Sequence, residues 1–119
     1  MRLKVAPVVL VPEGRVALSD DVGRAIGARV VVMVVGERPG LSASDSLGIY
    51  LTWVGPGPLS DADRNCISNV HPPAGLDYAQ GAAKCAWLVQ EALARGYTGV
   101  RLKDESPAGL TLAASAEEA

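Results

Sequence analysis

Residues 30–45 read VVVMVVGERPGLSASD, an apolar run that ends in a charged turn bounded by two glycines. The run is too short to span a membrane, and its valines suit a β-strand that is covered on both faces. Such strands are typical of parallel sheets, where ligands bind beyond the carboxyl ends of the strands. The stretch therefore predicts a central strand at Arg29–Val35 and a ligand-facing turn at Gly36–Gly40.

Length and charge limit the kinds of partner. The 119 residues make one domain, predicted to span 1–104, and the acidic tail 105–119 lacks periodicity, which predicts disorder. Basic and acidic residues, 11 and 13 in number, are well mixed. Neither nucleic acid nor a membrane is therefore predicted as a partner. A chain this small cannot enclose a bulky cofactor alone, so a partner subunit is implied.

The cysteines and the histidine do not form a recognisable metal site. Cys66 and Cys85 fall in different predicted elements without CxxC spacing, and His71 is the only histidine. This set supplies too few ligands for a histidine-based zinc site, so no metal bound by side chains is predicted and both thiols are expected to be reduced. No segment resembles a signal peptide, which predicts a cytoplasmic protein.

Alternating strands and helices predict the fold. Ser19 is expected to cap the first helix and Gly27 to end it, and Gly96 is expected to end the longest helix. The arrangement predicts an α/β fold, a three-layer Rossmann-like domain with a small, mostly parallel sheet and helices on both faces. The predicted strands are 5–11, 29–35, 48–54 and 99–103, the helices are 20–26 and 77–95, and one or two helical turns lie within 60–69. The predicted apolar stripe of the longest helix is Ala79, Ala82, Ala86, Val89 and Leu93.

Glu37 stands in the turn after the strongest strand. A carboxylate there repels phosphate, and neither GxGxxG nor GxxxxGK[ST] is present, so a phosphate cradle is excluded. The carboxylate is better suited to accept hydrogen bonds from neutral amides. The residues alone favour a simpler interpretation, a loop ion pair with Arg38 or another basic residue.

Cys66, within Asn65–Asn69, could be taken for a nucleophile. A catalytic cysteine needs a neighbouring base, and the only histidine is separated from it and flanked by prolines. Cys66 could instead pack against a large flat cofactor, although a buried structural cysteine is the first expectation from sequence alone.

Six motifs, in order over roughly Pro12–Asp104, resemble the C-terminal half of the light chain (small subunit) of ethanolamine ammonia-lyase. They are GRVAL (14–18), DDVGRAIGA (20–28), VVVMVVGERPG (30–40), SLGIYLTW (46–53), DADRNCISNVHP (61–72) and GVRLKD (99–104). The resemblance implies a Rossmann-like domain that meets adenosylcobalamin where it contacts a TIM-barrel heavy chain. It implies cofactor contacts at Val16, Glu37 and Cys66 and no catalytic residue in this chain. An ordinary core valine is the alternative for Val16.

The resemblance also implies the reaction and the state of the cofactor. The family enzyme converts ethanolamine to acetaldehyde and ammonia by radical chemistry that the heavy chain performs. The Asp-x-His-x-x-Gly motif, by which many cobalamin domains replace the cofactor's lower base, is missing around His71. Base-on cobalamin is therefore expected.

The sequence differs from the family pattern at its N-terminal end. Light chains carry a long N-terminal region that is associated with packaging into bacterial microcompartments, and here GRVAL follows soon after Met1. The expectation is therefore a free cytoplasmic location. Two alternatives stay open: a truncated binding or assembly module without turnover, and a stand-alone flavodoxin-like binder of small molecules.

Overall fold

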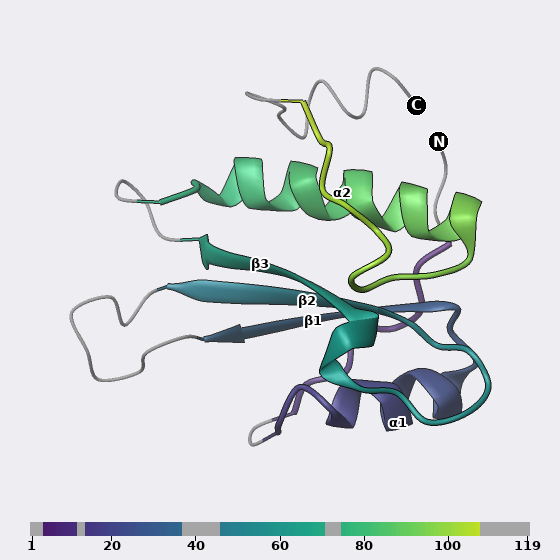
Figure 1. The fold of residues 1–119 in the computed structure, drawn as a ribbon. Helices are drawn as coiled ribbons and strands as arrows, with labels where there is room; N and C mark the ends of the chain where they lie inside the picture. The colour runs from purple at the N-terminus through teal and green to yellow at the C-terminus, as the bar shows by residue number, and fades with distance from the viewer. Residues whose placement is uncertain (1–3, 12–13, 37–45, 71–74, 108–119) are drawn as a thin grey trace.

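The computed structural model describes residues 4–11, 14–36, 46–70 and 75–107, and in strand β3 it describes only the backbone of Asn69. The regular structure of these described residues consists of two α-helices, a short 3-10 helix and three strands (Figure 1). In chain order they are α1 (Leu18–Ile26), β1 (Val30–Gly36), β2 (Leu47–Trp53), η1 (Asp61–Asp63), β3 (Arg64–Val70) and α2 (Tyr78–Arg95).

The sheet is antiparallel throughout, with the strand order β1-β2-β3. The predicted three-layer Rossmann-like fold with a mostly parallel sheet is therefore wrong. Residues 37–46 and 54–63 connect successive strands, and each connection is shorter than the dozen or so residues that a parallel crossover needs. Neighbouring strands consequently run in opposite directions. Helix α2 lies along the sheet, and α1 lies on the side away from α2 (Figure 1).

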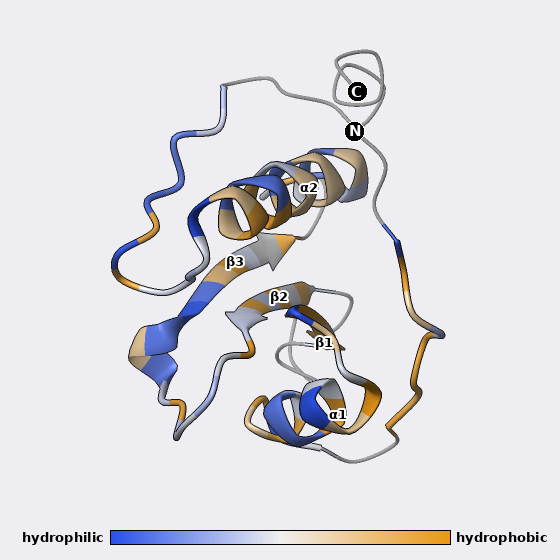
Figure 2. Ribbon diagram, turned by 90° about the vertical axis from the view of Figure 1, so that its right-hand side faces the viewer, coloured by the Kyte–Doolittle hydropathy of each residue, from blue (hydrophilic) through white to orange (hydrophobic). Residues whose placement is uncertain are grey.

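Two predicted strands do not form. Residues 5–11 have no regular structure, and their apolar side chains are exposed on a segment that runs along the outside of the molecule (Figure 2). Residues 99–103 form turns and a bend, beginning with Gly99 at φ 96°. An apolar or β-branched run becomes a strand only when a neighbouring strand pairs with it, and neither segment has such a neighbour among the described residues.

Local capping signals fix the ends of the long helix well. Asp77 accepts a hydrogen bond from the Gln80 backbone N–H and Gln80 accepts one from the Asp77 N–H, so α2 begins with a capping box. Gly96 ends it in the left-handed conformation, as predicted. In α1, Gly27 is the predicted stop. Ser19, however, lies inside α1 and donates to the Val16 carbonyl oxygen at 2.7 Å.

The core lies between the sheet and α2. Ile49, Leu51, Ile67 and Val70 from the sheet are buried against Leu88 and Ala92 of the helix, and Leu102 completes the cluster. The buried residues of α2 are Gly81, Ala83, Leu88 and Ala92, so the predicted stripe is wrong. Gly81 lies close to the sheet, since an added Cβ would be 3.1 Å from a Val70 methyl group. Close approach to the sheet, and not the average apolarity of a face, selects the buried side.

Strand β1 is an edge strand of the described sheet, because it pairs only with β2. The predicted central position, covered on both faces, is therefore wrong for this structure. Val32 and Val34 keep 41% and 58% of their surface exposed. Helix α1 packs on the other face, where an added Cβ at Gly23 would collide with Val31.

Cys85 gives the core a pH dependence that can be measured. Its burial raises the pKa of the thiol from 9.0 to about 11. A raised thiol pKa stabilises the folded state below pH 9, and this contribution is lost as pH rises through 11. We expect the free energy of unfolding to fall by about 1–2 kcal/mol more between pH 9 and 11 than in Cys85→Ala. Urea titrations at pH 8, 9, 10 and 11 measure it.

The exposed Cys66 supplies the matched control. Cys66→Ala should keep the pH dependence of the parent chain. Identical pH profiles for the parent and Cys85→Ala would show that burial of this thiol does not contribute.

Candidate functional site

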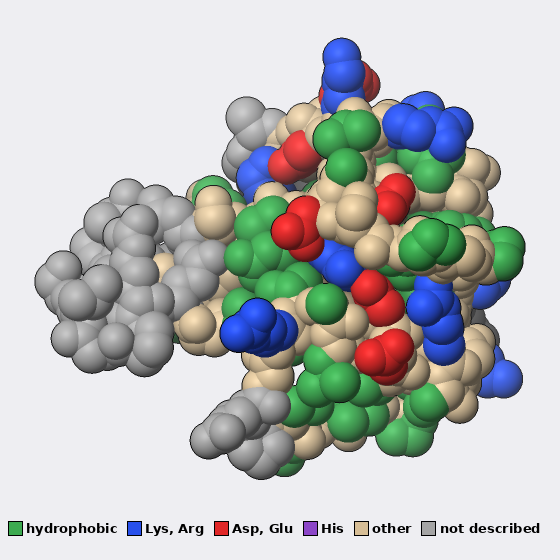
Figure 3. Space-filling view, turned by 60° about the horizontal axis from the view of Figure 1, so that its bottom comes forward, with side chains coloured by type: hydrophobic (Ala, Val, Ile, Leu, Met, Phe, Trp, Pro, Cys, Tyr) green, Lys and Arg blue, Asp and Glu red, His purple; other side chains and the backbone are tan. Residues whose placement is uncertain are grey.

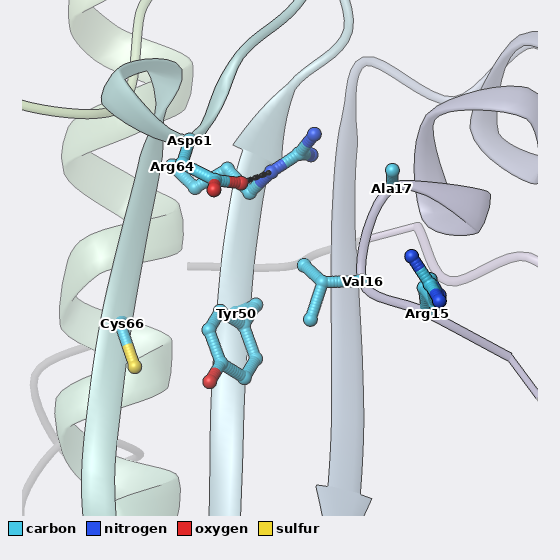
Figure 4. A pocket seen from close by; sticks show the side chains of 7 residues that line it. All are labelled: Arg15, Val16, Ala17, Tyr50, Asp61, Arg64 and Cys66. Atoms are coloured by element: carbon cyan, nitrogen blue, oxygen red, sulfur yellow. Dashed lines mark hydrogen bonds and ion pairs between the residues drawn. The ribbon is translucent and has the colours of Figure 1, made fainter.

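An open hollow of about 520 Å³ lies on the face of the sheet opposite α2 (Figure 4). The antiparallel register brings its strand residues to one face: Tyr50 stands opposite Cys66, and Thr52 stands opposite Arg64. The chain that enters α1 forms the other wall. The hollow, as the term is used below, is lined by Arg15, Val16, Ala17, Tyr50, Asp61, Arg64 and Cys66.

The structure brings together two of the three residues predicted to contact a cofactor. Val16 points toward Tyr50 from one side, and Cys66 stands on the neighbouring strand on the other side (Figure 4). Val16 is therefore not the ordinary core valine that sequence alone favoured, and Cys66 is exposed, not buried. Glu37, like His71, lies outside the described residues.

A buried ion pair fixes the two walls of the hollow relative to each other. Arg64 of β3 donates from both terminal nitrogens to the carboxylate of Asp20 in α1, over 2.5 and 2.8 Å. The two side chains are only 4% and 9% exposed. Arg64 also donates to the Thr52 hydroxyl at 3.1 Å and to Asp61 at 3.3 Å. The hydrogen bond to Asp20 is the largest of the effects that raise the pKa of Arg64.

The lining combines apolar surface with polar groups at the rim. Val16, Ala17 and Tyr50 offer apolar contact area, and Asp61 is 99% exposed, so its carboxylate is accessible to a ligand. The guanidinium of Arg64 is already paired with the Asp20 carboxylate. Apolar, acidic and basic side chains are intermixed on the side of the molecule that carries α1, without a large area of one charge (Figure 3). The arrangement suits a large neutral ligand with hydrogen-bonding groups at its edge.

The described lining offers no base for a cysteine nucleophile. No histidine is among the described residues of the hollow, so none of them supplies an imidazole beside Cys66. Within the described part of the chain, no cluster of His, Cys, Asp and Glu could hold a metal ion.

Sequence reasoning missed several lining residues. Tyr50, Asp61 and Arg64 are not among the site residues that the sequence predicts. Alternation along SLGIYLTW separates Tyr50 and Thr52 from Ile49 and Leu51, and that signal was available. The ion pair between Arg64 and Asp20 could not be predicted in this way, because the two residues are far apart in sequence.

The fold and the hollow define a small α+β domain with an open hollow on one face of its antiparallel sheet. The chain belongs to the ethanolamine ammonia-lyase light chain (EutC) family, whose sequence model matches residues 1–103. This confirms the resemblance seen in the motifs.

Curated relatives support the same assignment. The chain is 52% identical over 104 residues to the ethanolamine ammonia-lyase small subunit of Rhodopseudomonas palustris, and 53% identical over 102 residues to that of Azotobacter vinelandii. It is 57% identical over 99 residues to that of Bradyrhizobium diazoefficiens. These matches cover 83–87% of the chain but only 37–40% of the relatives. The chain thus spans about two fifths of their length. None of the helices in the described segments has the length and apolarity needed to cross a membrane.

Proposed function

We propose that this chain acts as part of the small subunit of an adenosylcobalamin-dependent ethanolamine ammonia-lyase, and that the hollow covers one side of the cofactor at the boundary with the heavy chain. The complex converts ethanolamine to acetaldehyde and ammonia. The observation that carries the proposal is that Val16 and Cys66, distant in sequence, line one hollow. Glu37 follows Gly36, the last residue of β1, directly along the chain.

The size of the hollow supports a shared site. Pockets of about 300–1,000 Å³ enclose drug-sized ligands, and a corrinoid is considerably larger than such a ligand. An open hollow of about 520 Å³ can therefore cover only part of it. The remaining surface of the cofactor would be covered by the heavy chain.

The residues present fit a corrinoid. Its ring system is flat and fringed by neutral amides, which the apolar surface of Val16 and Tyr50 and the accessible carboxylate of Asp61 can meet. Cys66 adds a small, polarisable side chain beside the ring. When bound, adenosylcobalamin supplies the radical chemistry. This chain's own residues bind the cofactor, orient it and exclude water from its edge.

One alternative is an assembly module that binds the heavy chain without turnover. The flavodoxin-like alternative loses its basis, because that fold requires a parallel sheet. Acetaldehyde release by the chain mixed with heavy chain, ethanolamine and adenosylcobalamin tests the proposal. Co-purification without activity would favour the assembly module.

Filling the hollow should weaken cofactor binding. In Cys66→Trp, an indole would occupy the space beside Tyr50, and we expect the affinity of the heavy-chain complex for cobalamin to fall about tenfold or more, which corresponds to at least about 1.4 kcal/mol. Equilibrium dialysis measures it.

The control for this substitution is Ala94→Trp, which adds the same side chain at an exposed position of α2, on the other face of the sheet. Its affinity should equal that of the parent. Equal affinities for Cys66→Trp and the parent, with both proteins folded, would remove the hollow from the cofactor site.

A further inference from the structure

We propose that Asp61 is a specificity-determining residue of the hollow. Its carboxylate accepts a hydrogen bond from the N–H of a primary amide at the edge of the corrinoid, and it disfavours a ligand that carries a carboxylate at the same place. This role rests on the proposed function and deepens it. Asp61 is not among the cofactor contacts that the sequence predicts.

Asp61 is the exposed end of a series of hydrogen bonds that begins inside the protein. The side chain of Arg64 is 4% exposed, and its terminal nitrogens donate to Asp20 and Thr52. Its third nitrogen, Nε, donates to Asp61 Oδ1 at 3.3 Å, and the side chain of Asp61 is 99% exposed. A buried guanidinium therefore holds one oxygen of an exposed carboxylate at the rim of the hollow (Figure 4).

The backbone that carries Asp61 is also held in place. Ser60 and Asp63 form a capping box around the short helix η1, in which the Ser60 N–H donates to the Asp63 carboxylate at 2.8 Å. Between them, the Ala62 carbonyl oxygen accepts from the Val100 N–H at 2.9 Å. A group that is already ordered loses little freedom when a ligand binds to it. Asp61 therefore stands on a preorganised support.

The second oxygen of Asp61 is available to a ligand. Within the described ranges, the hydrogen bond from Arg64 uses Oδ1, and no other group there donates to this carboxylate. Asp63 in the same helix differs, because its carboxylate accepts from both the N–H and the hydroxyl of Ser60. Asp63 thus stabilises η1, whereas Asp61 presents an acceptor to the hollow.

The chemistry of this acceptor predicts a preference between two kinds of corrinoid edge. An ionised carboxylate has no proton to donate, so it can accept from the N–H of a primary amide but cannot pair with a second carboxylate. Arg64 cannot offset the repulsion between two carboxylates, because its guanidinium is already paired with Asp20. Arg15, the other basic residue of the lining, stands on the opposite wall (Figure 4). An edge that bears an amide beside Asp61 should therefore bind more tightly than one that bears a carboxylate.

Binding of modified cobalamins to the complex of this chain with the heavy chain tests the preference. The probes are cyanocobalamin and its monocarboxylates, in each of which one peripheral amide has been hydrolysed to a carboxylate. We expect at least one monocarboxylate to bind about tenfold or more weakly than cyanocobalamin, because like charges would meet at Asp61. In Asp61→Asn, whose amide can donate as well as accept, the ratio of the two affinities should fall to about threefold or less. Equilibrium dialysis measures both affinities.

Asp63→Asn is the matched control, because it makes the same change in the same short helix. The asparagine oxygen can still accept from Ser60, and the affinity ratio should equal that of the parent. Equal ratios in the parent and Asp61→Asn, with cyanocobalamin bound by both, would overturn the role of Asp61 and leave the proposed function standing. A parent complex that binds no cyanocobalamin would overturn the proposed function and the role of Asp61 together.

An ion pair between Asp61 and a basic residue of the heavy chain is the competing interpretation. Titration of the chain with heavy chain in the absence of any cobalamin distinguishes the two. We expect the parent and Asp61→Asn to bind the heavy chain with equal affinity. A lower affinity of Asp61→Asn for the heavy chain, with an unchanged ratio between the cobalamins, would assign the carboxylate to the subunit contact and overturn its role in ligand selection.

Discussion

Asp20→Asn is expected to lower the free energy of unfolding by about 3 kcal/mol or more. The substitution leaves the guanidinium of Arg64 only 4% exposed and without its bidentate partner. Removing one member of a buried ion pair typically costs about 3–5 kcal/mol, because the remaining charge is uncompensated. Urea denaturation followed by circular dichroism measures the loss.

The neighbouring residue provides the control. Asp21 occupies the same first turn of α1 but is exposed, so Asp21→Asn should cost about 1 kcal/mol or less through the helix dipole. In the double variant Asp20→Leu/Arg64→Met both charges are removed, and stability should exceed that of Asp20→Asn. Equal effects of Asp20→Asn and Asp21→Asn would show that the buried pair contributes little.

Gly99→Ala should lower the free energy of unfolding about as much as Asp20→Asn does, for a steric reason. Gly99 has φ 96°, and a Cβ at this position would collide with the Ala62 carbonyl oxygen. The surrounding segment cannot move away easily, because Asn65 accepts from the Gly99 N–H at 2.7 Å and donates to the Leu102 carbonyl at 2.8 Å. We expect a loss of about 3–5 kcal/mol. Differential scanning calorimetry should show a correspondingly lower Tm.

Gly27→Ala separates the collision from backbone strain. Gly27 has a similar φ of 72°, but nothing lies within 4 Å of an added Cβ. It should cost only about 1–2 kcal/mol, the penalty of the left-handed conformation. A similar Tm for the two variants would mean that the contact with Ala62 is relieved without cost.

The buried Asp20–Arg64 pair joins α1 to β3, and Arg64 itself lines the hollow. Loss of the pair should therefore alter the spacing between Val16 and Cys66 as well as stability. The stability measurements above and the cofactor measurement with Cys66→Trp address these two consequences separately.

The sequence by itself determined the features that depend on neighbours along the chain. The capping residue Asp77 and the stop Gly96 delimit α2, and β-branched runs locate β1 and β2 to within a residue or so. The family was also evident from local motifs, because these are preserved as short segments. Val16 and Cys66 came from that resemblance, and the structure then placed them in one hollow.

Only the tertiary structure decided strand direction, strand order and the buried faces. RNCISN is too polar to predict a strand, yet β3 forms because it pairs with β2 and buries Ile67 and Arg64 against distant elements. The valine-rich segment 5–11 reads as a strand but has no strand beside it in the described structure. Strand pairing and burial depend on contacts between residues far apart in sequence, which a local sequence pattern does not predict.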